Sequence, residues 1–204
     1  MSARRIDREN KKHDIALAAM SVFADHGFDS TSMSRVASEA GIGKGTIYEY
    51  FSSKDDLIAT SIRLWMQNMA EETEKALEAI PDPESRLRAY VHSLVDMFLT
   101  DEKMPRLMVS CFQFFMTRRS DTKFSDTLRI MFRAGVSSIE RILLDGMEAG
   151  VFRIESYQDA ERIAVNLTAF LDGICLDYLA TGGVFDLREQ VEYYMRYLLE
   201  ADIK

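Results

Sequence analysis

Residues 31–57 read TSMSRVASEAGIGKGTIYEYFSSKDDL, and their spacing predicts two short helices joined by a glycine-containing turn. The first helix of this pair ends at Gly41 and repeats apolar residues at helical spacing, namely Met33, Val36, Ala37 and Ala40. After the turn Gly41-Ile42-Gly43, the next helix covers residues 44–51 and places Ile47 and Phe51 on one face. Two short helices joined in this way are typical of a helix-turn-helix motif, whose second helix enters the major groove of DNA.

Helical spacing also recurs through the rest of the chain, and no segment alternates apolar and polar residues long enough to predict a strand. A first helix ends at Gly27 and carries one apolar stripe, formed by Ile15, Ala18, Ala19, Val22 and Phe23. Thr31 or Ser32 can cap the second helix. Later helices are expected over residues 84–100, 104–118, 122–149, 157–181 and 186–201. The sequence therefore predicts an all-α protein of about nine helices.

The clearest break in the pattern is Pro81-Asp82-Pro83, which ends a long fourth helix that begins at Ser53 with Asp56 three residues later. We therefore expect an N-terminal three-helix domain over residues 1–56, with the helix-turn-helix at about 32–51. A connecting helix covers residues 57–80, and a larger helical domain covers residues 81–204.

The composition excludes several classes of protein. Of the 204 residues, 47% are apolar, 10 are Gly and 3 are Pro, so neither low-complexity disorder nor collagen fits. No unbroken apolar run reaches about eighteen residues, the length that spans a bilayer, so no membrane contact is expected. Cys111 and Cys175 stand singly in apolar stretches, which favours buried core cysteines in a reducing cytoplasm over a reactive thiol.

Charge is distributed unevenly along the chain. Residues 1–54 carry 8 Lys and Arg against 7 Asp and Glu, whereas residues 55–204 carry 17 against 26. The first twelve residues hold a local basic excess, with Arg4, Arg5, Arg8, Lys11 and Lys12 against Asp7 and Glu9. This excess fits either a contact with a polyanion or a solvated tail, and charge alone favours neither.

The second helix of the motif carries side chains suited to DNA. Because Ile47 points inward, its polar and aromatic neighbours project outward and offer an ammonium group, hydroxyls and flat rings to phosphates and base edges. Gly43 and Gly45 let backbone amides approach a phosphate closely. Lys54 can reach the DNA backbone beyond the motif. The expected DNA-contacting set is Ser32, Ser34, Gly43, Lys44, Gly45, Thr46, Tyr48, Tyr50 and Lys54.

These motifs together resemble the DNA-binding domain of the TetR family of transcriptional regulators. The resemblance covers roughly residues 10–65 and rests on Gly27-Phe28, Thr31-Ser32-Met33, Val36-Ala37, the run Gly41–Phe51 and Ser53-Lys54-Asp55-Asp56-Leu57. It implies an Ω-shaped homodimer that binds a palindromic operator in double-stranded DNA. It also implies a C-terminal domain that binds an effector and dimerises. In the family, the positions of Lys44, Thr46, Tyr48, Tyr50 and Lys54 contact DNA.

Glu49 departs from the family pattern, which often has a basic or aromatic residue at this position of the recognition helix. A carboxylate at this place can accept a hydrogen bond from a cytosine amine. The favoured reading is that Glu49 points away from DNA or is tolerated at a cost, since phosphates repel it.

Two other functions fit parts of the sequence less well. The run Gly43-Lys44-Gly45-Thr46 resembles the end of a phosphate-binding loop of a nucleotide-binding enzyme, but Ser38 stands where the pattern needs its first glycine, and a helix precedes it instead of a strand. A nonspecific DNA-packaging protein is disfavoured because the later part of the chain is acidic. No catalytic motif occurs and the three histidines lie far apart in sequence, so we expect no enzyme activity, no metal and no cofactor.

The segment Met104–Thr117 is apolar on every side and is expected to be buried all round. It forms either a central core helix or one wall of an effector cavity. The candidate effector-binding residues are Phe98, Met108, Cys111, Phe112, Phe115, Phe132 and Phe170.

The last two helices carry more apolar surface than one packed face needs. Small residues on the penultimate helix permit close helix approach, and tyrosines on the last helix are of a type enriched at interfaces. The candidate dimer-interface residues are Ala169, Gly173, Leu176, Tyr193, Tyr194 and Tyr197. We expect a cytoplasmic dimeric regulator, most simply a repressor that a small, largely hydrophobic effector releases from its operator.

Overall fold

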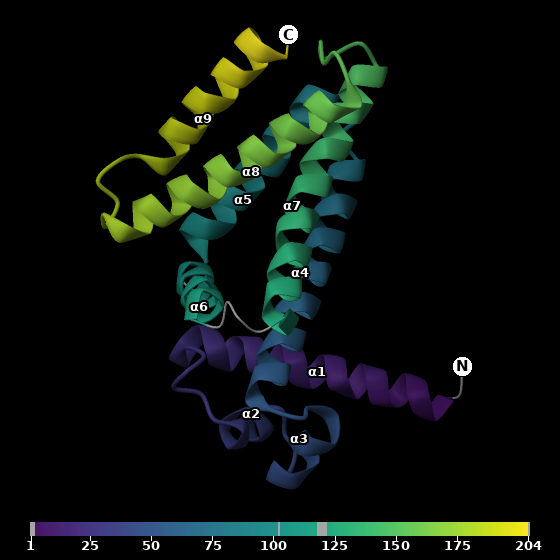
Figure 1. Ribbon diagram of the computed structural model, residues 1–204, viewed down its shortest axis with the longest axis vertical. Coiled ribbons are helices and arrows are strands. Elements are labelled where there is room, and N and C mark those ends of the chain that lie inside the picture. Colours follow the sequence, from purple (N-terminus) through teal and green to yellow (C-terminus); the bar gives the residue numbers. More distant parts are fainter. Residues whose placement is uncertain (1–2, 102, 118–121, 204) are drawn as a thin grey trace. The chain divides into compact units, whose positions relative to one another are not determined.

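The computed structural model describes residues 3–101, 103–117 and 122–203, which form nine α-helices, one π-helical turn and no strand (Figure 1). The helices are α1 (Ala3–His26), α2 (Met33–Glu39), α3 (Lys44–Tyr50), α4 (Lys54–Glu78), α5 (Pro83–Thr100), α6 (Lys103–Thr117), α7 (Thr122–Glu148), α8 (Tyr157–Ala180) and α9 (Leu187–Tyr197). The predicted all-α fold is confirmed.

The last helix differs from the prediction, and the first helix begins at a point that the sequence left open. The first helix begins at Ala3, so the basic residues near the N-terminus lie on a helix instead of an irregular tail. The last α-helix ends at Tyr197 because the backbone continues as the π-helical turn η1 (Leu198–Asp202). The side chains of Asp82 and Asp186 accept hydrogen bonds from backbone amides in the first turns of α5 and α9.

The chain forms two compact units. Unit 1 comprises Met1–Met69 and Lys103–Met131, and unit 2 comprises Ala70–Glu102 and Phe132–Lys204. The helices α4 and α7 each begin in unit 1 and end in unit 2. The division differs from the expected domain boundary near residue 81, because α6 packs with the N-terminal helices.

The core of unit 1 joins α1, α2, α3 and the first part of α4 to α6. Leu107, Cys111 and Phe114 of α6 are buried in the same apolar cluster as the N-terminal helices. The Phe114 ring meets the Phe28 ring edge-on at 5.3 Å between centroids. The expectation that α6 is buried on every side is wrong for the single chain, since Phe112 is 51% exposed and Met116 57% exposed. Helix α6, although apolar on every side, therefore has one packed face and one exposed face in the single chain.

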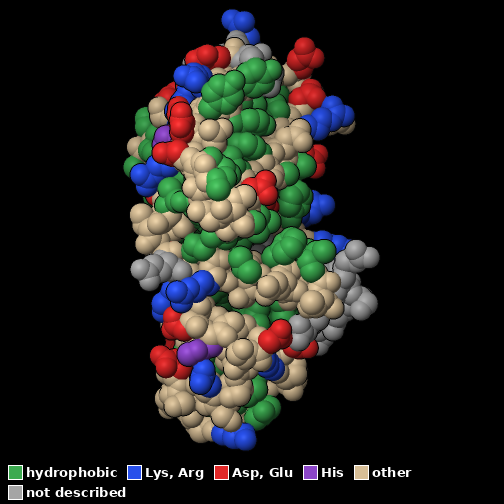
Figure 2. Space-filling model, turned by 90° about the vertical axis from the view of Figure 1, so that its left-hand side faces the viewer, with side chains coloured by type: hydrophobic (Ala, Val, Ile, Leu, Met, Phe, Trp, Pro, Cys, Tyr) green, Lys and Arg blue, Asp and Glu red, His purple; other side chains and the backbone are tan. Residues whose placement is uncertain are grey.

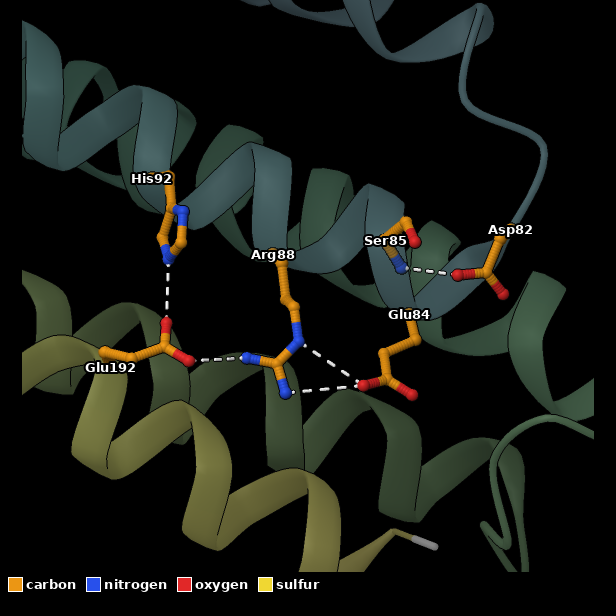
Figure 3. A network of polar contacts seen from close by, with 6 residues as sticks. All are labelled: Asp82, Glu84, Ser85, Arg88, His92 and Glu192. Carbon is orange, nitrogen blue, oxygen red and sulfur yellow. Dashed lines mark hydrogen bonds and ion pairs between the residues drawn. The ribbon is translucent and has the colours of Figure 1, made fainter.

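Unit 2 is built from α5, α8, α9 and the later parts of α4 and α7. Arg88 and His92 of α5 both contact the carboxylate of Glu192 on α9, at 2.8 and 2.9 Å, and Arg88 also contacts Glu84 (Figure 3). A close approach of backbone to ring occurs at Gly146, since a Cβ there would lie 2.1 Å from Phe152. These contacts fix α9 against α5 and the end of α7 against the chain that follows it.

Candidate nucleic-acid interface

The first helix of the motif, α2, is held at its start by two hydroxyl groups. The Ser32 side chain accepts a hydrogen bond from the Arg35 amide at 3.3 Å and caps the helix. The buried Thr31 hydroxyl donates to the Gly27 carbonyl at 2.8 Å and ties the loop to the end of α1. The cap at Ser32, one of the two predicted alternatives, is confirmed. Ser34 lies exposed in the first turn of α2.

The turn between α2 and α3 depends on Gly41. Its φ is +65°, a left-handed conformation that a residue with a Cβ rarely adopts. The Ile42 amide then donates to the Ala37 carbonyl at 2.9 Å, which closes the end of α2. Gly43 has an ordinary extended backbone (φ −67°) and precedes the first residue of α3. Gly41 therefore sets the direction in which α3 leaves α2.

Helix α3 has one buried face and one open face. Ile47 is fully buried in the unit 1 core. Residues two positions away point roughly in the opposite direction, because each residue turns the helix by about 100°. Gly45 and Glu49 occupy these positions and are exposed. Glu49 thus lies on the outward face of the helix.

The remaining candidate side chains of α3 flank this outward line. Lys44 is exposed, Tyr48 is 52% exposed, and Thr46 and Tyr50 are half-buried. The structure therefore brings Lys44, Gly45, Thr46, Tyr48 and Tyr50 together on one short helix. Their contacts with DNA remain a prediction.

Lys54 begins α4 and also holds the loop before α2. Its Nζ donates a hydrogen bond to the Asp29 carbonyl at 2.8 Å. At the same helix start, the Ser53 hydroxyl accepts from the Asp56 amide at 3.0 Å, and the Asp56 carboxylate accepts from the Ser52 amide at 2.9 Å. Lys54 thus connects α4 to the α1–α2 loop, a contact that its place in the sequence did not predict.

Two basic residues of α1 contact the end of α3. Arg8 donates a hydrogen bond to the Glu49 carbonyl at 2.8 Å, and its guanidinium carbon lies 6.0 Å from the centre of the Tyr50 ring. The Lys12 ammonium lies 5.3 Å from the centre of the Phe51 ring. The sequence signal for both is the basic excess near the N-terminus, which gave no partner for either residue.

The candidate effector residues fall in both units. Met108, Cys111 and Phe112 belong to unit 1, where Met108 is half-buried and Cys111 lies in the core. Phe98, Phe132 and Phe170 belong to unit 2, where they are buried, 41% exposed and half-buried respectively. The side chain of Phe115 lies outside the described part of the structure. Whether these residues share one cavity remains a prediction.

Unit 2 contains a cavity of about 270 Å³ that none of the candidate effector residues lines. Its walls come from α4, α5 and α7, and they are formed by Thr73, Glu74, Leu77, Glu78, Arg86, Tyr90, Ser138, Arg141, Ile142 and Asp145. Arg86 pairs with Asp145 at 2.6 Å, and Arg141 pairs with Glu74. Burial is the largest cause that raises the pKa of Tyr90 above its ordinary value, and a hydrogen bond with the Ser138 side chain offsets part of this rise. The lining is more polar than the expected hydrophobic effector site.

The candidate dimer residues lie on α8 and α9 of unit 2. Ala169, Tyr193 and Tyr197 are exposed, and Gly173, Leu176 and Tyr194 are half-buried. Ala169 and Gly173 line a groove with Phe170, Ile174, Asp177, Phe185 and Gln190, and the Phe170 ring stacks on the Tyr194 ring at 4.0 Å. Figure 2 shows hydrophobic side chains gathered in the upper half of the view, which includes α8 and α9.

Neither cysteine has the character of a nucleophile. Burial raises the pKa of Cys111 to about 12, and burial with the nearby Asp172 charge raises that of Cys175 to about 11. Within the described residues, no group of three or more His, Cys, Asp or Glu could hold a metal ion. By length and composition alone α8 could cross a membrane, although 28% of its most apolar window is buried inside the chain.

Family models match both the N-terminal and the C-terminal part of the chain. Residues 15–60 match the family model of bacterial regulatory proteins of the tetR family. Residues 83–201, more than half of the chain, match the C-terminal model of BetI-type transcriptional repressors.

Individual relatives agree with these matches. The chain is 26% identical over 194 residues to the HTH-type transcriptional regulator AcrR of Shigella flexneri, covering 95% of this chain and 89% of that protein. It is 31% identical over 104 residues to the HTH-type transcriptional activator FasR of Mycolicibacterium smegmatis, covering 51% and 48% of the two chains. Among solved structures, the transcriptional regulator FadR from Bacillus subtilis in complex with stearoyl-CoA has the same fold, with a TM-score of 0.71, 18% identity and coverage of 92% and 97%.

Proposed function

The chain belongs to the TetR family of DNA-binding transcriptional regulators, and we propose that it is a repressor that binds a palindromic operator as a homodimer. The observation that carries this proposal is the pair α2 and α3, joined by a turn at Gly41, with one face of α3 open. An exposed short helix with an ammonium group, hydroxyls and aromatic rings is suited to a major groove.

The residues that bind DNA in this proposal are those of the α2–α3 unit. Lys44 and Lys54 supply positive charge for phosphates, and Tyr48 and Thr46 offer groups to base edges. Ser32 and Ser34 lie at the start of α2, and Gly43 and Gly45 at the start of α3, where backbone amides are accessible to a phosphate.

Selection from a pool of duplexes with a randomised central segment tests this function. We expect enrichment of a palindrome whose half-sites lie about one helical turn or more apart. Binding to the enriched duplex should weaken steeply with salt, because lysines and arginines release phosphate counterions. Retention of all sequences alike would support the DNA-packaging alternative instead.

The nucleotide-binding alternative is not supported by the position of Gly43-Lys44-Gly45-Thr46. Gly43 precedes α3 and the other three residues form its first turn, with helix α2 before them, whereas a phosphate-binding loop follows a buried strand. As a regulator, the protein is proposed to act in the cytoplasm and without enzymatic activity. ATP with magnesium should leave the melting temperature unchanged.

We propose the cavity of unit 2 as the effector site. Its volume of about 270 Å³ is near the lower end of the range for small-molecule sites. Leu77 and Ile142 offer apolar contacts, and the Tyr90 and Ser138 hydroxyls offer polar ones. Because both arginines of the lining are already paired with carboxylates, an effector with apolar and uncharged polar parts fits best. The solved FadR structure contains stearoyl-CoA, whose charged phosphates and large size do not match this cavity, so smaller uncharged compounds are the first ones to test.

Native mass spectrometry of the protein as purified tests the effector site. Thr73→Trp places a large side chain at the cavity wall, whereas Glu71→Trp changes an exposed residue of the same helix that does not line it. We expect Thr73→Trp to lose a co-purified small molecule and to keep operator binding. Glu71→Trp should retain both. Equal loss in the two variants would contradict this site.

A further inference from the structure

Arg8 of α1 reaches the last turn of the recognition helix. Its Nη2 donates a hydrogen bond to the Glu49 carbonyl at 2.8 Å, and its guanidinium carbon lies 6.0 Å from the centre of the Tyr50 ring. A planar guanidinium group can donate to an oxygen and lie over an aromatic ring at the same time. One side chain of α1 therefore contacts two consecutive residues of α3.

Helix α3 has little stability of its own. It is seven residues long, and it has no basic residue in its last turn. The last carbonyls of a helix lack partners within the helix, and positive charge near them is favourable. A helix this short depends on tertiary contacts for its order. Arg8 supplies, from another helix, the donor and the positive charge that the last turn of α3 lacks.

The same contact places a cation beside the acidic residue of the recognition helix. Glu49 is exposed on the face opposite Ile47, where a carboxylate and DNA phosphates repel each other. The Arg8 guanidinium is hydrogen-bonded to the main chain of that residue and remains exposed itself. Its sequence neighbours are Asp7 and Glu9, and with Lys12, whose ammonium lies over the Phe51 ring, it places positive charge at this end of α3.

Helix α1, which carries Arg8, packs firmly in the core of unit 1. Ile15, Ala16 and Ala19, about two to three turns further along α1, are fully buried in the unit 1 core. This packing holds the backbone of α1 in place, so that the Arg8 side chain can fix the position of α3.

We propose that Arg8 is a positioning residue for sequence recognition, which fixes the last turn of α3 through the Glu49 carbonyl and the Tyr50 ring and offsets the Glu49 carboxylate. The part of the inference that concerns DNA rests on the proposed function, because it requires α3 to meet phosphates and bases.

Hydrogen exchange of the free protein tests the positioning without DNA. The Phe51 amide donates to the Ile47 carbonyl at 3.0 Å and reports on the last turn of α3. In Arg8→Ala, this amide and that of Tyr50 should exchange about tenfold faster, while the amides of α2 keep their rates. Lys11→Ala is the matched control, since it removes one charge from the same helix and should leave α3 unchanged.

Binding to the selected duplex tests the consequence for recognition. Arg8→Ala should lose roughly tenfold in affinity for the selected duplex but much less for a scrambled duplex, and Lys11→Ala should weaken both equally. Glu49→Gln should restore part of the loss, because the charge that needs an offset is gone. Arg8→Lys keeps the positive charge but lacks the planar guanidinium group, so it should discriminate less well than the wild type between the selected and the scrambled duplex.

Each negative result has its own meaning. Unchanged exchange in Arg8→Ala, together with an equal loss on both duplexes, would overturn the proposal and leave Arg8 as a phosphate contact. A wild-type protein that discriminates no sequence would contradict the proposed function, while the exchange rates would still decide whether Arg8 orders α3.

Discussion

Single side chains of α3 differ in what they can contribute to DNA binding. Lys44 is exposed in the first turn of α3 and carries a charge, which attracts phosphates of any sequence. Tyr48 is half exposed and carries a hydroxyl on a rigid ring, which can reach a base edge. Affinity and sequence preference are therefore expected to separate when these two residues are changed one at a time.

The first prediction concerns Lys44. Lys44→Ala should reduce the slope of the logarithm of affinity against the logarithm of salt concentration by about 1, with the preferred sequence unchanged. Fluorescence anisotropy at several salt concentrations measures both. Lys75→Ala, a loss of charge in the last turn of α4, is the control and should leave the slope as it is. A changed base preference in Lys44→Ala would instead mean that this side chain reads bases.

The second prediction concerns the close approach at Gly146. A Cβ at this position would lie 2.1 Å from the buried Phe152 ring, so Gly146→Ala should destabilise the protein by about 1–3 kcal/mol. Gly135→Ala, in the same helix, meets only a Thr168 methyl at 3.5 Å and should be neutral or slightly stabilising. Urea unfolding separates the two. Equal stability of both variants would show that Phe152 moves aside freely.

At the scale of helices, the α2–α3 pair could be predicted from sequence because local chemistry determines it. Gly41 requires a left-handed backbone, Ser32 caps α2, and Ile47 points inward, all within one short stretch. The contacts of Arg8 and Lys54 could not be predicted, since each joins residues far apart in the chain. The local sequence pattern predicts each helix, whereas the partner of a long charged side chain depends on how the helices pack against one another.

Helix α6 illustrates the same limit. Its sequence is apolar all round, which predicts burial but says nothing about what covers each face. In the structure one face packs against α1, and the other carries the exposed Phe112 and Met116.

The third prediction uses the two faces of α6. Phe114→Ala should destabilise unit 1 by about 3–5 kcal/mol, because it empties a buried site against Phe28. Phe112→Ala, two residues away and 51% exposed, should change the stability of the single chain by less than about 0.5 kcal/mol. Differential scanning calorimetry at low protein concentration measures both. A large loss in Phe112→Ala would mean that a second chain or a ligand covers this face.

At the scale of the whole molecule, the proposed dimer depends on the surface of α8 and α9. A Cβ at Gly173 meets no atom within 4 Å in the single chain, so nothing within it requires glycine. A close helix of a partner chain would supply that requirement.

The fourth prediction follows from this observation. Gly173→Ala should raise the dimer dissociation constant by roughly tenfold or more, while the monomer keeps its stability. Analytical ultracentrifugation measures the first and urea unfolding the second. Gly135→Ala serves again as the helical-glycine control, and unchanged dimerisation in Gly173→Ala would place the interface elsewhere.

The fifth prediction concerns induction. Helix α4 begins at Lys54 beside the DNA-reading helices, and its last turns contribute Thr73, Glu74, Leu77 and Glu78 to the cavity. A ligand in the cavity changes DNA affinity only through its preference for one conformation, and a tilt of α4 would change the spacing of the recognition helices against grooves about 34 Å apart. Cross-linking the two DNA-binding domains at their DNA-bound separation should abolish release by the effector. Release at unchanged potency would rule out the tilt.

The packing of α6 into unit 1 has a consequence for engineering. The core around α1 is completed by Leu107, Cys111 and Phe114, which follow in the chain only after residues of unit 2. A graft that transfers residues 1–69 alone onto another sensor would leave that core open. Functional chimaeras, and natural recombination between members of the family, therefore need crossover points that carry α6 together with the N-terminal helices, or a recipient whose own α6 presents matching apolar side chains.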